Sequence, residues 1–199
     1  MSATIFSEGG GDKEVTRSRF RAGLSEYCAK LRPPGSRLRI VADGGRDQTF
    51  DKFKRAVLDS RAGEVSVLLV DSEGPVTANS PAEHLRAHDG WDLASLRKHR
   101  VFLMVQVMEA WFLADREALT AFYDGGFLPN SLPGRPANTE AIRKEDIEAA
   151  LKNATRKMKT KGEYHKIDHG SALLALIDPN KVGAASPHAD SFHKFLREL

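Results

Sequence analysis

The chain has 199 residues, of which 41% are hydrophobic and 29% charged, and its formal net charge is +3. A chain of this length can bury a core as one domain, and its composition excludes a disordered, collagen-like or coiled-coil protein. The sequence does not start with a basic segment followed by a long apolar run, and no stretch reaches the roughly 20 apolar residues that a bilayer span needs. We therefore expect a cytoplasmic protein with no membrane partner.

The first half of the chain alternates short apolar runs with amphipathic stretches, a pattern typical of strands that alternate with helices. Strands are predicted within residues 4–10, 37–45, 64–74 and 100–106, and helices at residues 15–31, 49–61, 80–88 and 108–123. Parallel neighbours need crossover connections, so this order predicts an α/β fold. We expect a mainly parallel sheet of about four strands, flanked by helices.

Several residues of these helices have predicted structural roles. Ser80 is expected to cap the short helix at residues 80–88. The one cysteine, Cys28, cannot form an internal disulfide and is expected to be buried as a small apolar residue. The side chains expected to face inward from the helix at residues 49–61 are Phe50, Phe53, Val57 and Leu58.

The sequence changes character after a loop rich in Gly and Pro at residues 125–135. The remainder reads as helical, with helices predicted at residues 138–158, where Asn138 and Thr139 can cap the start, and at 171–177 and 186–199. We expect residues 1–125 to form the α/β domain and residues 126–199 to form a helical, basic extension packed on it as part of one structural unit.

A basic strip lies within this extension, at residues 152–166. Its bases are Lys152, Arg156, Lys157, Lys159, Lys161 and Lys166, and its one acid is Glu163. Such a strip suggests a phosphate-rich partner, and a solvated helix end explains it equally well.

Polar residues follow each of the predicted strands. They are Glu8, Asp43, Asp71, Glu73, Gln106 and Glu109. The carboxyl ends of parallel strands meet at one edge of the sheet, where ligands bind, and Asp71 and Glu73 point to the same side if the segment stays extended. Converging carboxylates repel one another unless a cation lies between them, and oxygen ligands favour Mg²⁺ or Mn²⁺. The alternative is that Asp71 caps the following helix and Glu73 is solvated.

Glycines follow the first predicted strand, in the stretch EGGGDK. This stretch is neither a Walker A loop nor a GxGxxG motif. Gly9 and Gly10 either turn the chain tightly into the next helix or leave backbone N–H groups free to bind a phosphate at the helix start.

The combination resembles the Toprim fold, the metal-binding catalytic domain of topoisomerases, bacterial primases and the overcoming-lysogenization-defect nucleases. That family has a Glu-Gly pair after the first strand and Asp-x-Asp after the third; the matching residues here are Glu8-Gly9 and Asp71-Ser72-Glu73. More specifically, the chain is similar to a Toprim-like family known as domain of unknown function 4276. The matching stretches are FSEGGGDK, DGGRDQTFDKF, LLVDSEGP, VQVMEAWFLADREAL and YHKIDHGSALLALIDPNKV.

The resemblance implies that Glu8, Asp71 and Glu73 are catalytic metal ligands. Glutamate replaces the second aspartate of the pattern at position 73, which bears on whether two metals can bind. Glu109, in the MEAW segment, is a fourth candidate ligand; its alternative role is a carboxylate favoured by the dipole at a helix N-terminus.

Basic and histidine side chains could complete such a site. Lys166 is the candidate catalytic cation that stabilises the charge developing on phosphorus, and Arg46 is a second candidate that binds phosphate; an ordinary surface or ion-pair role is the alternative for both. The residues predicted to contact nucleic-acid phosphates are Lys157, Lys159 and Lys161. His169 is a candidate general acid or phosphate ligand, with a structural histidine as the alternative.

These residues and the resemblance predict a divalent-metal-dependent nuclease that acts on DNA or RNA, with Mg²⁺ or Mn²⁺ as cofactor. Similar Toprim-like proteins in phage-defence loci are encoded beside an ABC-type or AAA-type ATPase, so the resemblance implies an effector subunit with an ATPase partner. The alternatives are a non-catalytic subunit that docks on such an ATPase, and an enzyme of small-molecule phosphoryl transfer. Self-association is left open.

Overall fold

A computed structural model of the chain describes residues 2–42, 44–96, 99–134 and 137–199. Its sheet is formed by β1 (Ser2–Ser7), β2 (Arg37–Val41), β3 (Glu64–Asp71) and β4 (His99–Met104). All pairings are parallel and the strand order is β2-β1-β3-β4. The prediction of an α/β fold with a parallel sheet of about four strands is confirmed.

One face of the sheet carries the larger apolar core. Alternate residues of the central strands, such as Ile5 and Val67, point into this core, where they meet Phe20 and Leu24 of α1 (Glu14–Ala29). Successive side chains of a strand point to opposite faces of the sheet, so each central strand contributes side chains to two apolar cores. Cys28 is fully buried here, as expected.

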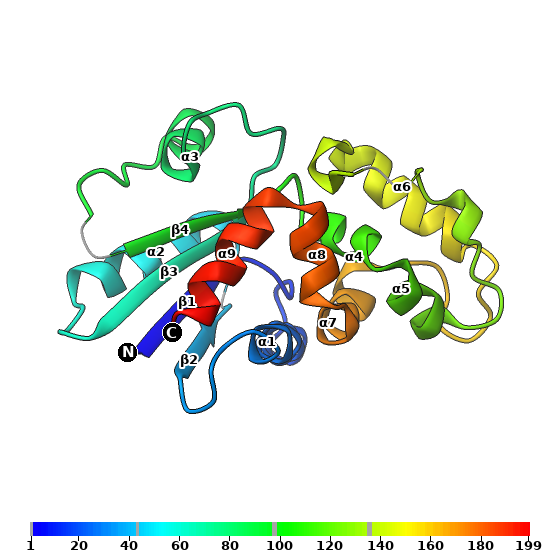
Figure 1. Ribbon diagram of the computed structural model, residues 1–199, viewed down its shortest axis with the longest axis horizontal. Helices are drawn as coiled ribbons and strands as arrows, with labels where there is room; N and C mark the ends of the chain where they lie inside the picture. Colours follow the sequence, from blue (N-terminus) through cyan, green and yellow to red (C-terminus); the bar gives the residue numbers. More distant parts are fainter. Residues whose placement is uncertain (1, 43, 97–98, 135–136) are drawn as a thin grey trace.

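The opposite face is covered by α2 (Arg46–Leu58) and by the segment that contains α3 (Pro81–Asp89), as Figure 1 shows. Phe6 and Leu68 of the strands pack against Phe53 of α2. Ser80 caps α3 by accepting a hydrogen bond from the Glu83 N–H, as predicted. The prediction that Leu58 faces inward is wrong: this last residue of α2 is 68% exposed.

The helix predicted at residues 108–123 is two helices, α4 (Glu109–Ala114) and α5 (Arg116–Tyr123). Asp115 separates them because its backbone leaves the helical conformation and its side chain accepts a hydrogen bond from the Ala118 N–H. The same buried carboxylate also accepts from the Asp178 N–H and pairs with Lys181. A local cap and two distant partners therefore explain the break.

The second half is helical, with two 3-10 turns. Its elements are η1 (Pro129–Ser131), η2 (Thr139–Ala141), α6 (Lys144–Thr155), α7 (Lys166–Leu176), α8 (Pro179–Ala185) and α9 (Pro187–Arg197). The predicted start of the helix at residue 138 is wrong. Asn138 does cap, but it caps the short turn η2, and the helix begins six residues later at Lys144.

These helices pack directly on the sheet layer. Helix α7 lies against α1, and α9 crosses the sheet beside β4, where Phe102 packs on Phe192 and Phe195 with ring centroids 5.3 and 5.4 Å apart (Figure 1). One apolar core runs from Ala3 to Leu196 through both halves. The division at residues 125 and 126 stays a prediction. Within the described ranges, no helix is both long and apolar enough to span a membrane.

Candidate metal centre

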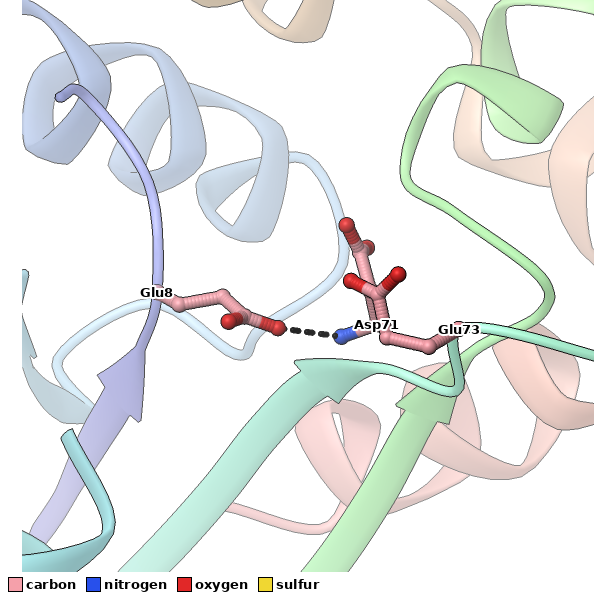
Figure 2. A group of neighbouring side chains, drawn as sticks. All are labelled: Glu8, Asp71 and Glu73. Atoms are coloured by element: carbon pink, nitrogen blue, oxygen red, sulfur yellow. Dashed lines mark hydrogen bonds between the residues drawn. The ribbon is translucent and has the colours of Figure 1, made fainter. Parts of the chain in front are cut away.

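The two central strands bring three carboxylates together. Because Ser7 of β1 lies opposite Leu69 of β3 in the parallel register, the residue after β1 reaches the end of β3. There the Asp71 N–H donates a hydrogen bond of 3.0 Å to Glu8 Oε1. Figure 2 shows the side chains of Glu8, Asp71 and Glu73 converging above these strand ends. One oxygen of each of the three carboxylates lies within 4.8 Å of the others.

The backbone conformation that brings Glu73 into this cluster differs from the predicted extended strand. The prediction assumed an extended segment through Glu73, but β3 ends at Asp71 and Glu73 has a left-handed backbone with φ of 61°. The turn is held by hydrogen bonds from the Ser72 N–H to the Met104 carbonyl and from the Glu73 N–H to the Gln106 carbonyl. The convergence of Asp71 and Glu73 is therefore produced by a turn docked on the end of β4.

Burial and neighbouring charges shift the pKa values of Asp71 and Glu8 in this cluster. The pKa of Asp71 is raised to about 7, chiefly by burial; Lys166 opposes the change, and the nearby Glu109, Glu8 and Glu73 add to it. The pKa of Glu8 is also raised, mainly by burial, although Arg46 opposes the change. Like charges held this close in a buried place favour a bound cation. An oxygen-only donor set of this kind fits a hard divalent ion such as Mg²⁺ or Mn²⁺.

Arg46 lies beside Glu8 and is tied into the fold. Its Nη1 donates to Glu8 Oε1 and to the Asp71 carbonyl, each at 2.8 Å. Its other donors form a bidentate pair with Asp89, and its guanidinium lies 5.1 Å from the ring centroid of Trp91. The structure thus places this predicted phosphate ligand where it orients Glu8 through one oxygen of that carboxylate.

Lys166 and Glu109 lie on the other side of Asp71. The Nζ of Lys166 is 3.4 Å from Asp71 Oδ2 and 3.4 Å from Glu109 Oε2. Burial lowers the pKa of Lys166, but Asp71 and Glu109 outweigh burial and hold it above its ordinary value, so the side chain is cationic. It is half-exposed, which leaves it accessible to an anion in the site.

Glu109 itself, a predicted metal ligand, is not part of the three-carboxylate cluster. It is 5% exposed, in the first turn of α4, and its Oε1 accepts a hydrogen bond from the Tyr164 hydroxyl. It faces Lys166 instead of the other ligands. The alternative that Asp71 caps the following helix is wrong, because Ser80 caps α3; Asp71 Oδ1 instead accepts a hydrogen bond from the N–H of Met108, which precedes α4.

The glycine loop forms one wall of a cavity that opens beside the carboxylates. Gly9 and Gly10 have φ values of 142° and 79°, which favour glycine, and a Cβ on Gly10 would lie 2.6 Å from the Cα of Arg17. The loop therefore turns tightly, as predicted, and also lines the cavity. The cavity measures about 300 Å³ and includes Glu8, Asp71, Glu73 and Lys166 in its lining.

The remaining candidates are not brought to this cavity. Lys157 and Lys159 are exposed near the end of α6, and Lys161 lies 5.1 Å from the ring centroid of Phe122. His169 is buried; its Nε2 donates a hydrogen bond to the Lys161 carbonyl, its Nδ1 accepts one from the Tyr123 hydroxyl, and its pKa is lowered by burial. These contacts match its structural alternative. Asp43 lies outside the described residues.

Sequence reasoning missed two residues that support the site. Lys144, at the start of α6, forms an ion pair with Glu73, and its pKa is raised chiefly by the hydrogen bond to that carboxylate. Asp89, at the end of α3, is 9% exposed in its side chain and holds Arg46. Both act across more than 40 residues of sequence, and no local motif marks either one.

The comparison with protein families gives one result. Residues 7–197 match the family described as a domain of unknown function (DUF4276). No significant match to a curated protein or to a solved structure was found. Because the match covers nearly the whole chain, including all three clustered carboxylates, the protein belongs to the DUF4276 family.

Proposed function

We propose that the protein is a divalent-metal-dependent phosphodiesterase of the Toprim type that cleaves nucleic acid, DNA or RNA. The observation that carries this proposal is the convergence of Glu8, Asp71 and Glu73, whose ligand oxygens lie within 4.8 Å of one another at the carboxyl ends of parallel strands. Mg²⁺ or Mn²⁺ bound there would supply Lewis acidity and charge neutralisation for hydrolysis of a phosphodiester.

The chain's own residues supply the rest of the chemistry. In hydrolysis, a water oxygen forms a bond to phosphorus, the bond from phosphorus to the ester oxygen breaks, and the leaving oxygen gains a proton. Lys166 is a half-exposed cation beside Asp71, placed to stabilise the negative charge that develops on the phosphoryl group. Arg46 and the Asp71 N–H orient Glu8 by occupying one of its oxygens.

The partners in this proposal follow from resemblance and charge. Its substrate is nucleic acid, and the exposed Lys157 and Lys159 would add weak contacts with the phosphate backbone away from the cavity. An ABC-type or AAA-type ATPase would be the protein partner, in a phage-defence pair in which this chain is the effector.

Labelled RNA, single-stranded DNA and duplex DNA, each incubated with Mg²⁺ or Mn²⁺, test the proposal. The wild type is expected to cleave at least one of them, and Glu8→Gln is expected to lose at least about 100-fold in rate. Glu26→Gln, a change at an exposed glutamate of α1, is the matched control and should retain the wild-type rate. Metal binding without any cleavage, alone or with a cognate ATPase, would favour the non-catalytic docking subunit.

A further inference from the structure

The cavity at the carboxylates has a second, chemically different lining. Besides the acidic residues and Lys166, its lining includes the apolar side chains of Phe20, Met104, Met108 and Ile167. These come from α1, the end of β4, the residue before α4, and α7. Four separate elements therefore hold an apolar surface within the same hollow as the three carboxylates.

A hydrated ion and a phosphate group do not account for this lining. Both are polar, and the carboxylates, Lys166 and the glycine-loop backbone already offer them contacts. Apolar side chains that border a cavity gain free energy when an apolar group covers them. Phe20, Met104 and Met108 are each at most 3% exposed, so the ligand that fits the whole hollow has a charged part next to a compact part with an apolar face.

The charge of the lining does not suit duplex nucleic acid as the ligand of this cavity. Proteins that grip duplex DNA neutralise many backbone phosphates with Lys and Arg. Of the described residues that line the cavity, only Lys166 carries a positive charge. One cation beside a metal centre fits one phosphodiester, and a volume of about 300 Å³ is at the lower limit of the range found for small-molecule sites.

A nucleotide that has left the base stack has both required parts. Its base presents an apolar face, and its edge carries hydrogen-bonding groups that need partners when they are buried. The hydroxyl of Ser171, which is half-buried on α7, and the backbone of Gly9 to Gly11 provide polar groups in the lining. In a duplex the same base would first have to be unpaired and unstacked, which costs a few kcal/mol.

We propose that the cavity receives the base and sugar of the nucleotide next to the reacting phosphodiester, so that the preferred substrate is single-stranded nucleic acid. This inference rests on the proposed function for the placement of the phosphate at Glu8, Asp71 and Glu73. It adds a specificity pocket whose wall includes Phe20, Met108 and Ile167.

Equilibrium binding separates this inference from catalysis. Fluorescent ten-nucleotide oligothymidylate and an abasic oligonucleotide of the same length are titrated with Glu8→Gln protein, which is expected not to cleave. The two ligands share their phosphates and sugars and differ only in the bases. Oligothymidylate should bind about 10-fold more tightly, in line with the free energy of one buried base.

Two neighbouring positions of α7 provide the variants. Ser171→Leu, in the same background, fills the cavity and should reduce the preference for bases to less than 2-fold, whereas Ala172→Leu on the exposed side should keep it. Ile167→Ala, which removes part of the wall, guards against misfolding of the first variant and should also weaken the preference. Circular dichroism and unfolding curves establish that each variant is folded.

The outcomes distinguish the inference from the proposed function. Equal binding of the two oligonucleotides, or a preference that survives in both cavity variants, would overturn the pocket even if the wild type is a nuclease. Wild-type protein that cleaves closed circular duplex DNA as fast as single-stranded DNA would also overturn it. A preference abolished by the cavity variants, together with no cleavage by the wild type, would support the pocket and reject the nuclease.

Discussion

Asp71 and His193 are both buried ionisable groups, and they differ in their neighbours. Asp71 lies among other carboxylates at the sheet edge, and burial raises its pKa to about 7. His193 of α9 lies in the apolar core, 2.7 Å from the Tyr27 hydroxyl and packed against Trp111, and burial lowers its pKa to about 4. The histidine is neutral at pH 7 and stabilises the fold, whereas the carboxylates retain a charge that a cation can neutralise.

Burial alone does not identify a functional site in this protein. Burial favours the neutral form in both places, and both groups obey this rule. The difference is the partner set: a neutral hydroxyl and aromatic rings at His193, and like charges with few compensating cations at Asp71.

The largest expected effect is a loss of stability in the metal-free protein as the pH rises from about 4 to about 7. The folded-state pKa of Asp71 is about 7 and its ordinary value is 3.8, so in this range the folded protein keeps a proton that the unfolded chain releases. The contribution of Asp71 to stability therefore falls with rising pH and levels off above pH 7. This contribution should fall by about 4 kcal/mol, measured as the difference between wild type and Asp71→Asn in urea unfolding with a chelator present.

Asp71→Asn is the control for this pH dependence. The asparagine can still accept the hydrogen bond from the Met108 N–H, but it does not ionise. Its unfolding free energy should exceed that of the wild type at pH 8, and this difference should shrink by about 4 kcal/mol as the pH falls from 7 to 4, because His193 titrates equally in both proteins. Equal slopes for the two proteins would show that Asp71 is not the destabilising charge.

At His193 the opposite pH dependence is expected. Its folded-state pKa of about 4 lies below the ordinary 6.5, so the unfolded chain takes up a proton first as the pH falls. The contribution of His193 to stability should drop by roughly 3 kcal/mol as the pH falls from 6.5 to 4 and level off below pH 4. His193→Gln should lack this drop in acid unfolding curves, whereas His165→Gln, at an exposed histidine, should keep it.

Metal affinity provides the third prediction. Asp71→Asn should weaken binding of Mn²⁺ by at least about 100-fold, because it removes a charged ligand from the set of three, whereas loss of an outer partner alone costs about 10- to 100-fold. Asp168→Asn, at an exposed aspartate of α7, is the matched control and should bind as the wild type does. Calorimetric titration measures both, and identical affinities would remove Asp71 from the ligand set.

The smallest expected effect concerns Lys144. This half-exposed lysine pairs with Glu73, so it competes with a cation for that carboxylate. Lys144→Ala should bind Mn²⁺ about 3-fold more tightly in the same titration, consistent with the modest strength of an exposed ion pair. Weaker binding would mean instead that the lysine is needed to position Glu73.

Much of the fold and the centre of the site could be predicted from the sequence. Alternating apolar runs and amphipathic stretches indicated the parallel sheet, and the carboxylates at strand ends indicated where Glu8, Asp71 and Glu73 converge. The spacing of Asp71 and Glu73 suggested an extended segment, but a turn held by the end of β4 brings them together. Such a turn depends on a strand that is distant in sequence.

The supporting residues could not be predicted, because their roles come from tertiary contacts. Asp89 and Lys144 are ordinary charged residues of helix ends until the fold brings them to Arg46 and Glu73. Asp115 likewise divides a periodic helical stretch because it binds the backbone of Asp178 as well as its own helix start. Local patterns carry no information about such partners.

The most direct test of the central claim is anomalous scattering from crystals of the protein soaked in Mn²⁺. The account predicts an anomalous peak about 2 Å from carboxylate oxygens of Glu8, Asp71 and Glu73. The peak should be absent from crystals of Asp71→Asn. A wild-type crystal with no peak between these three carboxylates, at a Mn²⁺ concentration that saturates the protein in solution, would contradict the account.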